Sequence, residues 1–265
     1  MSINRHAAGK TAVVTGASGG IGIETSRRLA QEGYRLALID YSDEAVAKAV
    51  ETVREEFPET DLLGIPCDVT SEESVALASE RLRTWTEEVQ VAALVAGVLQ
   101  EAAPVAELTA KEFDRVMATN LRGVFLASRA LIPFLPQNSG ASLVTIASWS
   151  GQLASAFFSA YCASKAGVIV FTQALAAELA PKGIRANSIS PGNIATGMHT
   201  TALQIEAEQR GISFEEMKSI EWAKIPLGYA GSPKCIADAV AFLASSDASY
   251  ITGTSLDVNG GVHFR

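Results

Sequence analysis

Short apolar runs bounded by turn residues alternate along this chain with segments of helical period. Most of the runs are almost continuously apolar and rich in β-branched residues, which is typical of strands buried on both faces of a parallel sheet. We expect strands at 11–16, 34–40, 62–69, 91–97, 142–148, 184–192 and 255–261. The alternation therefore predicts an α/β fold built from βαβ units, with a seven-stranded parallel sheet.

The segments between these runs carry apolar residues at intervals of three and four, which indicates amphipathic helices. The predicted helices are 21–33, 43–57, 71–85, 109–135, 161–180 and 233–246. Such helices would cover both faces of the sheet in a doubly wound arrangement. No linker rich in Pro, Gly or Ser, no repeat and no low-complexity segment interrupts the pattern, so we predict a single domain over residues 1–265.

One connection is much longer than the others. Residues 193–229 separate the sixth predicted strand from the last predicted helix, whereas such connections usually have about 2–6 residues. The portions 201–210 and 213–224 have an amphipathic helical pattern. Because ligands of open α/β sheets bind at the edge where this segment begins, we favour a small helical substrate lid over a plain insertion.

Composition argues against several function classes. The formal net charge of −8 disfavours a nucleic-acid-binding protein, which would carry a basic stripe. The N-terminus lacks the apolar core of a secretory signal, and no apolar run approaches the roughly 20 residues of a membrane helix, so we expect a cytoplasmic protein without a membrane partner. Cys67, Cys162 and Cys235 are odd in number and widely spaced, and the three histidines show no metal-ligand spacing. We therefore expect neither a disulfide framework nor a bound metal.

A glycine-rich turn, TGASGGIG at 15–22, stands between the first predicted strand and the first predicted helix. Gly16, Gly20 and Gly22 let the chain turn tightly and let a ligand approach the backbone. The following helix offers free N–H groups and a positive dipole end to a pyrophosphate. A turn of this kind in this place indicates a dinucleotide site.

Asp40 ends the second predicted strand, 18 residues after Gly22. A carboxylate there can accept hydrogen bonds from the ribose hydroxyls of NAD, and it would repel the 2′-phosphate of NADP. Ala17 and Ser18 supply no basic partner for such a phosphate. We therefore predict NAD as the cofactor, with NADP disfavoured; the alternative is that Asp40 merely begins a loop.

The stretch SAYCASK, at 159–165, places a tyrosine four residues before a lysine. On a helix, Tyr161 and Lys165 would lie on one face. A phenol has an ordinary pKa of about 10, and a nearby ammonium favours the phenolate, so the pair could act as an acid/base near neutral pH. From the spacing alone, an ordinary exposed helix pair is the commoner interpretation.

Taken together, these motifs resemble the classical short-chain dehydrogenase/reductase family over about residues 9–262. The resemblance is carried by 15–22, Asp68-Val69, Ala96-Gly97, Asn120, Ser148, Tyr161, Lys165, Pro191-Gly192, Thr196 and YITGTSLDVNGG at 250–261. Each motif is ordinary alone, but their order and spacing are specific. The resemblance implies a Rossmann-like fold and hydride transfer between a nicotinamide cofactor and an alcohol or its ketone.

The resemblance also implies a catalytic set. Tyr161 would be the general acid/base, and Lys165 would lower the Tyr161 pKa and bond the nicotinamide ribose. Ser148 would polarise the substrate carbonyl as a hydroxyl donor. Asn120 would hold a water that links Lys165 to solvent.

The implied cofactor site is larger. It comprises Gly16, Ser18, Gly20, Ile21, Gly22, Asp40, Asp68, Val69, Ala96, Gly97, Tyr161, Lys165, Pro191, Gly192, Ile194 and Thr196. Asp68 would accept from the adenine amino group, while Pro191, Gly192, Ile194 and Thr196 would line the nicotinamide side. The sequence departs from the family in one place, because Leu94-Val95-Ala96-Gly97 stands where the pattern usually reads Asn-Asn-Ala-Gly. Hydrogen bonds of two polar side chains must therefore be replaced or absent.

Substrate recognition is expected between Ser148 and Tyr161, just after Gly192, and in the lid. The predicted pocket residues are Trp149, Gln152, Phe158, Asn193 and Met198. No cluster of Arg or Lys marks an acidic or phosphorylated substrate, so a small neutral secondary alcohol or its ketone fits. The lid and the C-terminal residues resemble polyol, sugar and acetoin-type members, which favours a polyol, sugar alcohol or diol.

Other functions stay open. A 3-oxoacyl thioester reductase is the alternative enzyme, although that reaction usually draws on NADPH and a basic docking face. A dinucleotide-binding protein without catalysis would be expected to have lost Tyr161 or Lys165, and a purely structural domain would leave the polar set unexplained. The helices at 109–135 and 161–180 are more apolar than one buried face requires. In similar proteins they form a four-helix contact, so we expect a homotetramer or homodimer.

Overall fold

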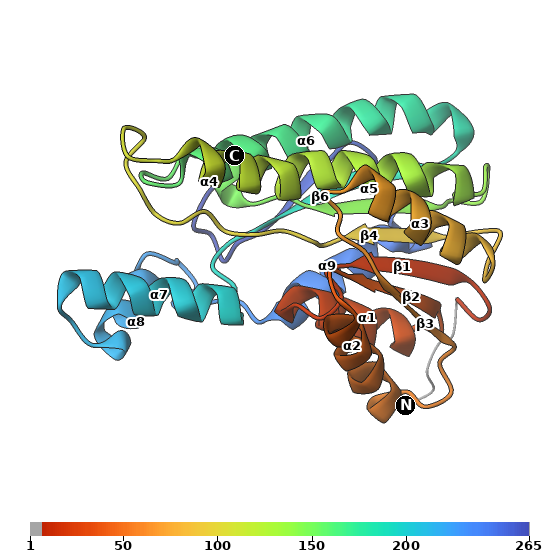
Figure 1. The fold of residues 1–265 in the computed structure, drawn as a ribbon, viewed down its shortest axis with the longest axis horizontal. Coiled ribbons are helices and arrows are strands. Elements are labelled where there is room, and N and C mark those ends of the chain that lie inside the picture. Colours follow the sequence, from red (N-terminus) through yellow and green to blue (C-terminus); the bar gives the residue numbers. More distant parts are fainter. Residues whose placement is uncertain (1–6, 265) are drawn as a thin grey trace.

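We describe the protein from a computed structural model, which covers residues 7–264; residues 1–6 and 265 of the predicted domain lie outside the described part. Seven parallel strands form one sheet in the order β3-β2-β1-β4-β5-β6-β7 (Figure 1). The strands are β1 (Thr11–Thr15), β2 (Arg35–Asp40), β3 (Leu62–Pro66), β4 (Val91–Leu94), β5 (Ser142–Ile146), β6 (Arg185–Pro191) and β7 (Ser255–Val258). The predicted seven-stranded parallel sheet is confirmed.

The central strands are buried on both faces, as their continuous apolar character predicts. All five residues of β1 are buried. Val13 packs into one hydrophobic cluster, whereas its neighbours Ala12 and Val14 pack into another. Because successive side chains of a strand point to opposite faces, the two clusters lie on the two sides of the sheet.

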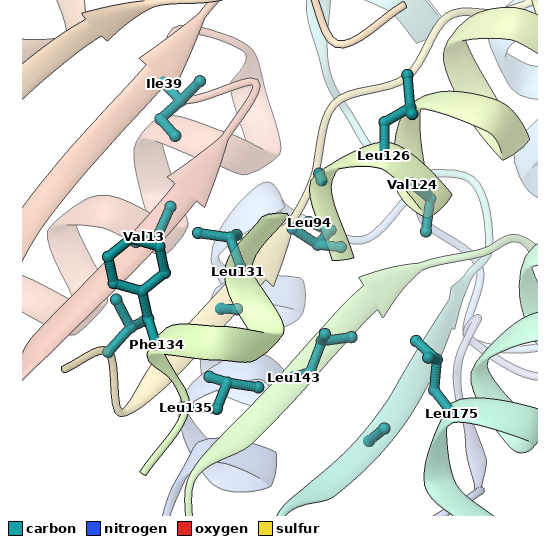
Figure 2. Close-up of a cluster of buried hydrophobic side chains, with 14 of the residues drawn as sticks. Val13, Ile39, Leu94, Val124, Leu126, Leu131, Phe134, Leu135, Leu143 and Leu175 are labelled. Atoms are coloured by element: carbon teal, nitrogen blue, oxygen red, sulfur yellow. The ribbon is translucent and has the colours of Figure 1, made fainter. Parts of the chain in front are cut away.

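Helices cover both faces. Figure 1 shows one group of helices above the sheet and the other group below it. The first group is α3 (Glu72–Arg83), α4 (Ala110–Met117), α5 (Gly123–Leu131) and α6 (Ser159–Leu179); the second is α1 (Gly20–Gln31), α2 (Asp43–Glu56) and α9 (Pro233–Ala244). Figure 2 shows part of the core on the first side, where Leu126 and Leu131 of α5 lie near Leu94 of β4. The Rossmann-like, doubly wound prediction is confirmed.

The helix predicted over 109–135 is not uniform. It consists of α4, one π-turn (Ala118–Arg122), α5 and a short 3₁₀ segment (Ile132–Phe134) that contains Pro133. A π-turn inserts one extra residue into a helix and is frequent at functional sites. Here it contains Asn120, whose side chain bonds the backbone of Val98 across the fold. The sequence pattern does not reveal this turn because the apolar period continues on both sides of it.

Helix α6 with the 3₁₀ turn that follows it, Ser159–Lys182, is long and apolar enough by composition to cross a membrane, with a mean hydropathy of 1.2. Lys165 and Glu178 interrupt this segment, so the sequence shows no continuous apolar run of membrane length there. Half of its apolar 18-residue window is buried inside the fold, where the helix packs against β5, β6 and the π-turn. We therefore interpret it as the core helix of this domain.

Two helices form the long excursion after β6, as predicted. They are α7 (Gly197–Arg210) and α8 (Phe214–Ala223), which pack on each other through Leu203, Ala207 and Met217. In Figure 1 they project beyond the sheet. Helix α7 begins four residues earlier than the sequence pattern predicts because the hydroxyl of Thr196 caps it by accepting from the His199 N–H at 3.3 Å.

A buried arginine joins the sheet to α9. Arg185, at the start of β6, donates to the carbonyl oxygens of Leu243 at 2.6 Å and Ser245 at 3.1 Å, at the end of that helix. Ser142 of β5 also donates to Leu243 O, at 3.0 Å. A cation at a helix C-terminus complements the free carbonyls and the helix dipole. Burial lowers the pKa of Arg185 from its ordinary value.

We predict that Arg185→Leu destabilises the fold by about 1–3 kcal/mol, because it removes two hydrogen bonds and leaves Ser245 O without this donor. Urea unfolding followed by circular dichroism measures the effect. Arg54→Leu, at the exposed end of α2, is the matched control and is expected to change stability by less than about 0.5 kcal/mol. Equal stabilities of the two variants would contradict the assignment.

Candidate active site

The residues singled out from the sequence gather at the carboxyl edge of the sheet. The strand order reverses between β1 and β4, which opens a crevice at this edge in doubly wound folds. Gly16 follows β1, Ala96 follows β4, Ser148 follows β5 and Gly192 follows β6. The topology thus brings four distant segments to one place.

The glycine-rich turn needs its glycines. Gly16 has φ +65°, and a Cβ on it would lie 2.8 Å from the Ala96 Cα. A Cβ on Gly22 would lie 1.9 Å from the Gly16 carbonyl oxygen. Helix α1 begins here with Gly19 as its N-cap and no side-chain cap, so its first N–H groups are available to a ligand. The turn fits the pyrophosphate of a dinucleotide, which requires both a close backbone approach and free N–H groups.

The Asp40 carboxylate ties this turn to the end of β2. One oxygen accepts from the Ser18 N–H at 2.8 Å, and the other accepts from the Tyr41 N–H at 2.8 Å. The negative charge therefore stands beside the glycine-rich turn, where a dinucleotide would place its adenosine ribose. This placement fits the role predicted for Asp40.

Asp68 and Val69 lie between β3 and α3. The Asp68 carboxylate accepts from the Thr70 N–H at 2.8 Å and the Thr70 hydroxyl at 2.7 Å through one oxygen. Val69 contacts the α5 backbone at Gly123, where an added Cβ would meet its Cγ2 at 3.0 Å. Their predicted contacts with an adenine stay a prediction.

The structure shows how the chain accommodates Leu94 and Val95 where the family pattern usually has two asparagines. Leu94 is buried in the cluster beneath α3 and α5, and Val95 packs against the cluster on the opposite face. The Thr15 hydroxyl accepts from the Val95 N–H at 3.1 Å and the Ala96 N–H at 3.2 Å. The backbone after β4 is therefore held by β1, while the two side chains enlarge the core.

Tyr161 lies on the first turn of α6, half-buried, and Ser148 lies buried just after β5. Burial raises the pKa of Tyr161 above its ordinary value, and a hydrogen bond with Ser148 opposes this rise. The sequence analysis expected a lower Tyr161 pKa, caused by Lys165. That expectation does not hold for the protein alone, because burial outweighs the other effects and the Lys165 Nζ lies 5.7 Å from the ring centre.

Lys165 is buried, with 4% of its surface exposed. Its Nζ donates to the Ile146 carbonyl at the end of β5, at 2.8 Å. Burial lowers the pKa of Lys165 from 10.5 to about 8. Because the carbonyl is a neutral partner, the ammonium is poorly compensated and readily loses its proton.

Asn120 is fully buried within the π-turn. Its carboxamide accepts from the Val98 N–H at 2.8 Å and donates to the Val98 carbonyl at 2.9 Å and the Ser164 hydroxyl at 3.1 Å. A Cβ on Gly97 would lie 3.2 Å from Asn120 Oδ1 and 3.4 Å from Lys165 Nζ. Asn120 thus holds the chain after β4 against α6; its predicted link to a water stays a prediction.

The side of the site that is predicted to face the nicotinamide is closely packed. A Cβ on Gly192 would lie 2.7 Å from the Asn259 Cα. Ile194 forms an isolated bridge with Gly231, and a Cβ on Gly20 would lie 3.0 Å from the Thr196 methyl group. Thr196 therefore stands next to the glycine-rich turn as well as capping α7. Gly20, Ile21 and Gly22 begin α1, and Pro191 ends β6.

The predicted substrate residues do not all behave alike. Trp149, Phe158 and Asn193 are half-buried and Met198 is exposed near this edge, so they stay candidates for a pocket. Gln152 differs, because its amide nitrogen donates to Ser190 Oγ at 2.9 Å and to Asp257 Oδ1 at 2.8 Å. Its nitrogen thus links the short turn after β5 to β6 and β7, a structural contact that the sequence pattern could not indicate.

Sequence reasoning missed Gln100. It is 2% exposed, and its side-chain oxygen accepts from the N–H groups of Ala160 at 2.8 Å and Tyr161 at 3.1 Å. Its amide nitrogen donates to the Phe157 carbonyl at 2.8 Å. The available signal was the absence of a Ser, Thr, Asp or Asn cap directly before the helix that carries Tyr161.

The chain matches known proteins along almost its whole length. A family model described as enoyl-(acyl carrier protein) reductase matches residues 16–263. (3R)-3-hydroxyacyl-CoA dehydrogenase of Homo sapiens is 36% identical over 258 residues, which cover 95% of this chain and 94% of that protein.

Two solved structures are similar in fold and sequence. A structure of NAD⁺-bound xylitol dehydrogenase superposes with a TM-score of 0.89 at 32% identity, covering 97% of this chain and 100% of that chain. A variant of actinorhodin polyketide ketoreductase with NADPH superposes with a TM-score of 0.90 at 31% identity, covering 96% of this chain and 97% of that chain.

The Lys165 environment predicts a pH dependence of stability. Burial lowers the folded pKa to about 8, so between about pH 8 and 10.5 the unfolded chain binds more protons and stability rises with pH. Relative to Lys165→Met, which lacks this titration, we expect the ligand-free protein to gain roughly 3 kcal/mol across that window. Urea unfolding at a series of pH values measures the difference, and parallel stability curves would contradict it.

Proposed function

Because this chain belongs to the short-chain dehydrogenase/reductase family and is an oxidoreductase acting on CH–OH groups, we propose that it interconverts a small neutral secondary alcohol and its ketone with NAD(H). The substrate class that we favour is a polyol, sugar alcohol or diol. The name of the similar xylitol dehydrogenase supports this class.

The proposal of a neutral substrate rests on the charges of residues 193–229, the long connection after β6. In residues 193–229, as far as the structure describes them, each lysine and arginine pairs with a glutamate of its own helix: Arg210 with Glu206, Lys218 with Glu215, and Lys224 with Glu221. The loop at 98–108 contributes Glu101 and Glu107 and no basic residue. In the described residues of these two segments, glutamates therefore balance the basic side chains, and no excess of positive charge favours a phosphate or carboxylate.

The catalytic set can move a proton at the substrate oxygen. Tyr161 would donate its phenolic proton to a ketone or accept a proton from an alcohol. Its raised pKa keeps it protonated at neutral pH in the protein alone, so a nearby positive charge must lower that pKa for the oxidation direction. Ser148 would hold the substrate oxygen by a hydrogen bond, and Lys165 would support the phenolate when its own proton is present. The bound nicotinamide would supply or accept the hydride.

The proposed cofactor is NAD. The Asp40 carboxylate at the glycine-rich turn favours ribose hydroxyls and repels a 2′-phosphate. Similar structures hold either nicotinamide cofactor, NAD⁺ in the xylitol dehydrogenase and NADPH in the ketoreductase. The choice for this chain therefore rests on Asp40.

A second candidate is a 3-hydroxyacyl or 3-oxoacyl thioester as substrate. The human relative is named for a 3-hydroxyacyl-CoA, and the matching family model is described as a reductase of acyl carrier protein substrates. This candidate requires a docking site for a phosphorylated carrier, which the paired cations of 193–229 do not favour.

We further propose that the protein is a cytoplasmic homodimer or homotetramer. The outer face of α4, α5 and α6 carries an apolar depression lined in part by Met117, Leu121 and Phe125 with Phe171. Phe125 and Val170 are exposed on this face. Association through it would bury these side chains.

The function is tested by following nicotinamide absorbance with NAD(H) and NADP(H) across xylitol, butane-2,3-diol, acetoin and acetoacetyl-CoA. We expect NAD-dependent turnover of a polyol or diol. Tyr161→Phe is expected to lower kcat/KM by about 10²–10⁴-fold, because it removes the acid/base. Tyr250→Phe, at a fully exposed tyrosine, is the control. Turnover of the thioester alone would favour the second candidate, and an active Tyr161→Phe would overturn the mechanism.

Cofactor preference is tested by Asp40→Ala. Removing the carboxylate removes both an acceptor for ribose hydroxyls and a charge that repels a phosphate. We expect the ratio of kcat/KM for NAD to that for NADP to fall at least about tenfold, or about 1.4 kcal/mol. Asp43→Ala, at an exposed carboxylate three residues further along, is expected to leave the ratio unchanged. A wild-type preference for NADP would contradict the role of Asp40.

A further inference from the structure

A single buried glutamine joins the loop after β4 to the first turn of α6. We propose that Gln100 is a positioning residue for Tyr161, which fixes where the catalytic helix begins and keeps a neutral group beside its first turn. This inference rests on the proposed function, in which Tyr161 is the acid/base. Gln100 acts through the backbone of α6.

The geometry of the contact is specific to Tyr161. The Gln100 oxygen accepts from the backbone N–H of Tyr161 itself at 3.1 Å, and from that of Ala160 at 2.8 Å. Phe158, the N-cap of α6, supplies no side-chain hydrogen bond. The helices α2, α3, α4, α7 and α8 are capped by a Ser or Thr directly before them. Helix α6 is instead capped by a residue 60 positions away along the chain.

The amide nitrogen of Gln100 donates to a residue whose backbone is strained. Phe157 has φ +68°, a left-handed conformation that is unfavourable for a residue with a side chain. Its carbonyl accepts from Gln100 Nε2 at 2.8 Å and from the Ala103 N–H at 3.1 Å. These two bonds stabilise the turn that leads into α6. The same side chain therefore fixes both the approach to the helix and its first turn.

The chemistry of the amide explains why glutamine suits this position. An amide combines an acceptor for two N–H groups with a donor for a carbonyl, and it carries no charge. A leucine would make none of these bonds. A glutamate would keep the acceptor, lose the donor when ionised, and place a negative charge beside Tyr161. Such a charge disfavours the phenolate and raises the pKa of Tyr161.

A positioning role has consequences that a merely structural role lacks. Cys162 on α6 raises the pKa of Tyr161 and the hydrogen bond with Ser148 lowers it, while the Lys165 Nζ lies 5.7 Å from the ring centre. The Gln100 amide bonds the backbone of Phe157, Ala160 and Tyr161 instead of these side chains. A change of charge at Gln100 therefore moves the titration of Tyr161, whereas loss of the amide displaces its hydroxyl.

The experiment compares full-length wild type, Gln100→Leu and Gln100→Glu, with Gln90→Leu at the opposite end of β4 as the matched control. Each of the first three is also made with Tyr161→Phe, so that a difference in tyrosinate absorbance isolates Tyr161. We expect Gln100→Glu to raise the midpoint of this titration by about one pH unit. We expect Gln100→Leu to accelerate amide hydrogen exchange at Ala160 and Tyr161 and to leave exchange in α9 unchanged.

Kinetics complete the test, with xylitol, butane-2,3-diol and 3-hydroxybutyryl-CoA as probes. We expect Gln100→Leu to lower kcat about 10-fold to 100-fold, because a displaced acid/base loses its alignment. The KM for NAD is expected to change less than about threefold, and Gln100→Glu is expected to shift alcohol oxidation to higher pH.

The inference is overturned if Gln100→Leu only lowers the melting temperature, with wild-type exchange at Tyr161 and unchanged kcat, or if the Tyr161 midpoint in Gln100→Glu equals that of wild type. The failure of the proposed function is distinguishable. It shows as an active Tyr161→Phe protein, whereas failure of this inference alone leaves Tyr161→Phe inactive.

Discussion

Burial of the sheet on both faces is the constraint on which this site depends. The central strands pack into hydrophobic clusters above and below the sheet, so these strands leave little room for polar chemistry along their length. Polar side chains can stand only where the strands end. Because all seven strands are parallel, those ends share one edge, and the order reversal between β1 and β4 opens it. Ser148, Asp40 and the glycine-rich turn all lie there as a result.

Burial also sets the electrostatics of Tyr161 and Lys165, the proposed catalytic pair. It raises the pKa of Tyr161 above its ordinary value and lowers that of Lys165 to about 8, so the lysine loses its proton at a lower pH than the tyrosine does. Tyr161 holds its proton and Lys165 readily loses one. The positive charge of a bound oxidised nicotinamide would therefore change the pKa values of both side chains. The π-turn at Asn120 and the amide of Gln100 hold the backbone that carries this pair. In the proposed mechanism, the position of the acid/base therefore depends on groups that act through the backbone.

Several residues show how far sequence reasoning reaches. The spacing of Tyr161 and Lys165 placed them on one turn of a helix, but it favoured an ordinary helix pair, and only the ordered set of motifs along the chain indicated an acid/base pair. Gln100 was missed because its partners lie about 60 positions away, and no local pattern encodes such a distance. Gln152 was assigned to a pocket because a lone amide near the site looks functional. Only the positions of β6 and β7 show that its nitrogen has partners there.

The sequence by itself determined the alternation of strands and helices, the glycine-rich turn and the acidic end of β2, and it supplied the residues proposed as the catalytic set, because each is encoded in local residue types and periods. The tertiary structure alone decided the strand order, the π-turn that holds Asn120, the support that Thr15 gives to the backbone after β4, and the direction in which burial shifts each pKa. These features arise from contacts between segments far apart in the chain. Their energies depend on desolvation and packing, which only the folded arrangement sets.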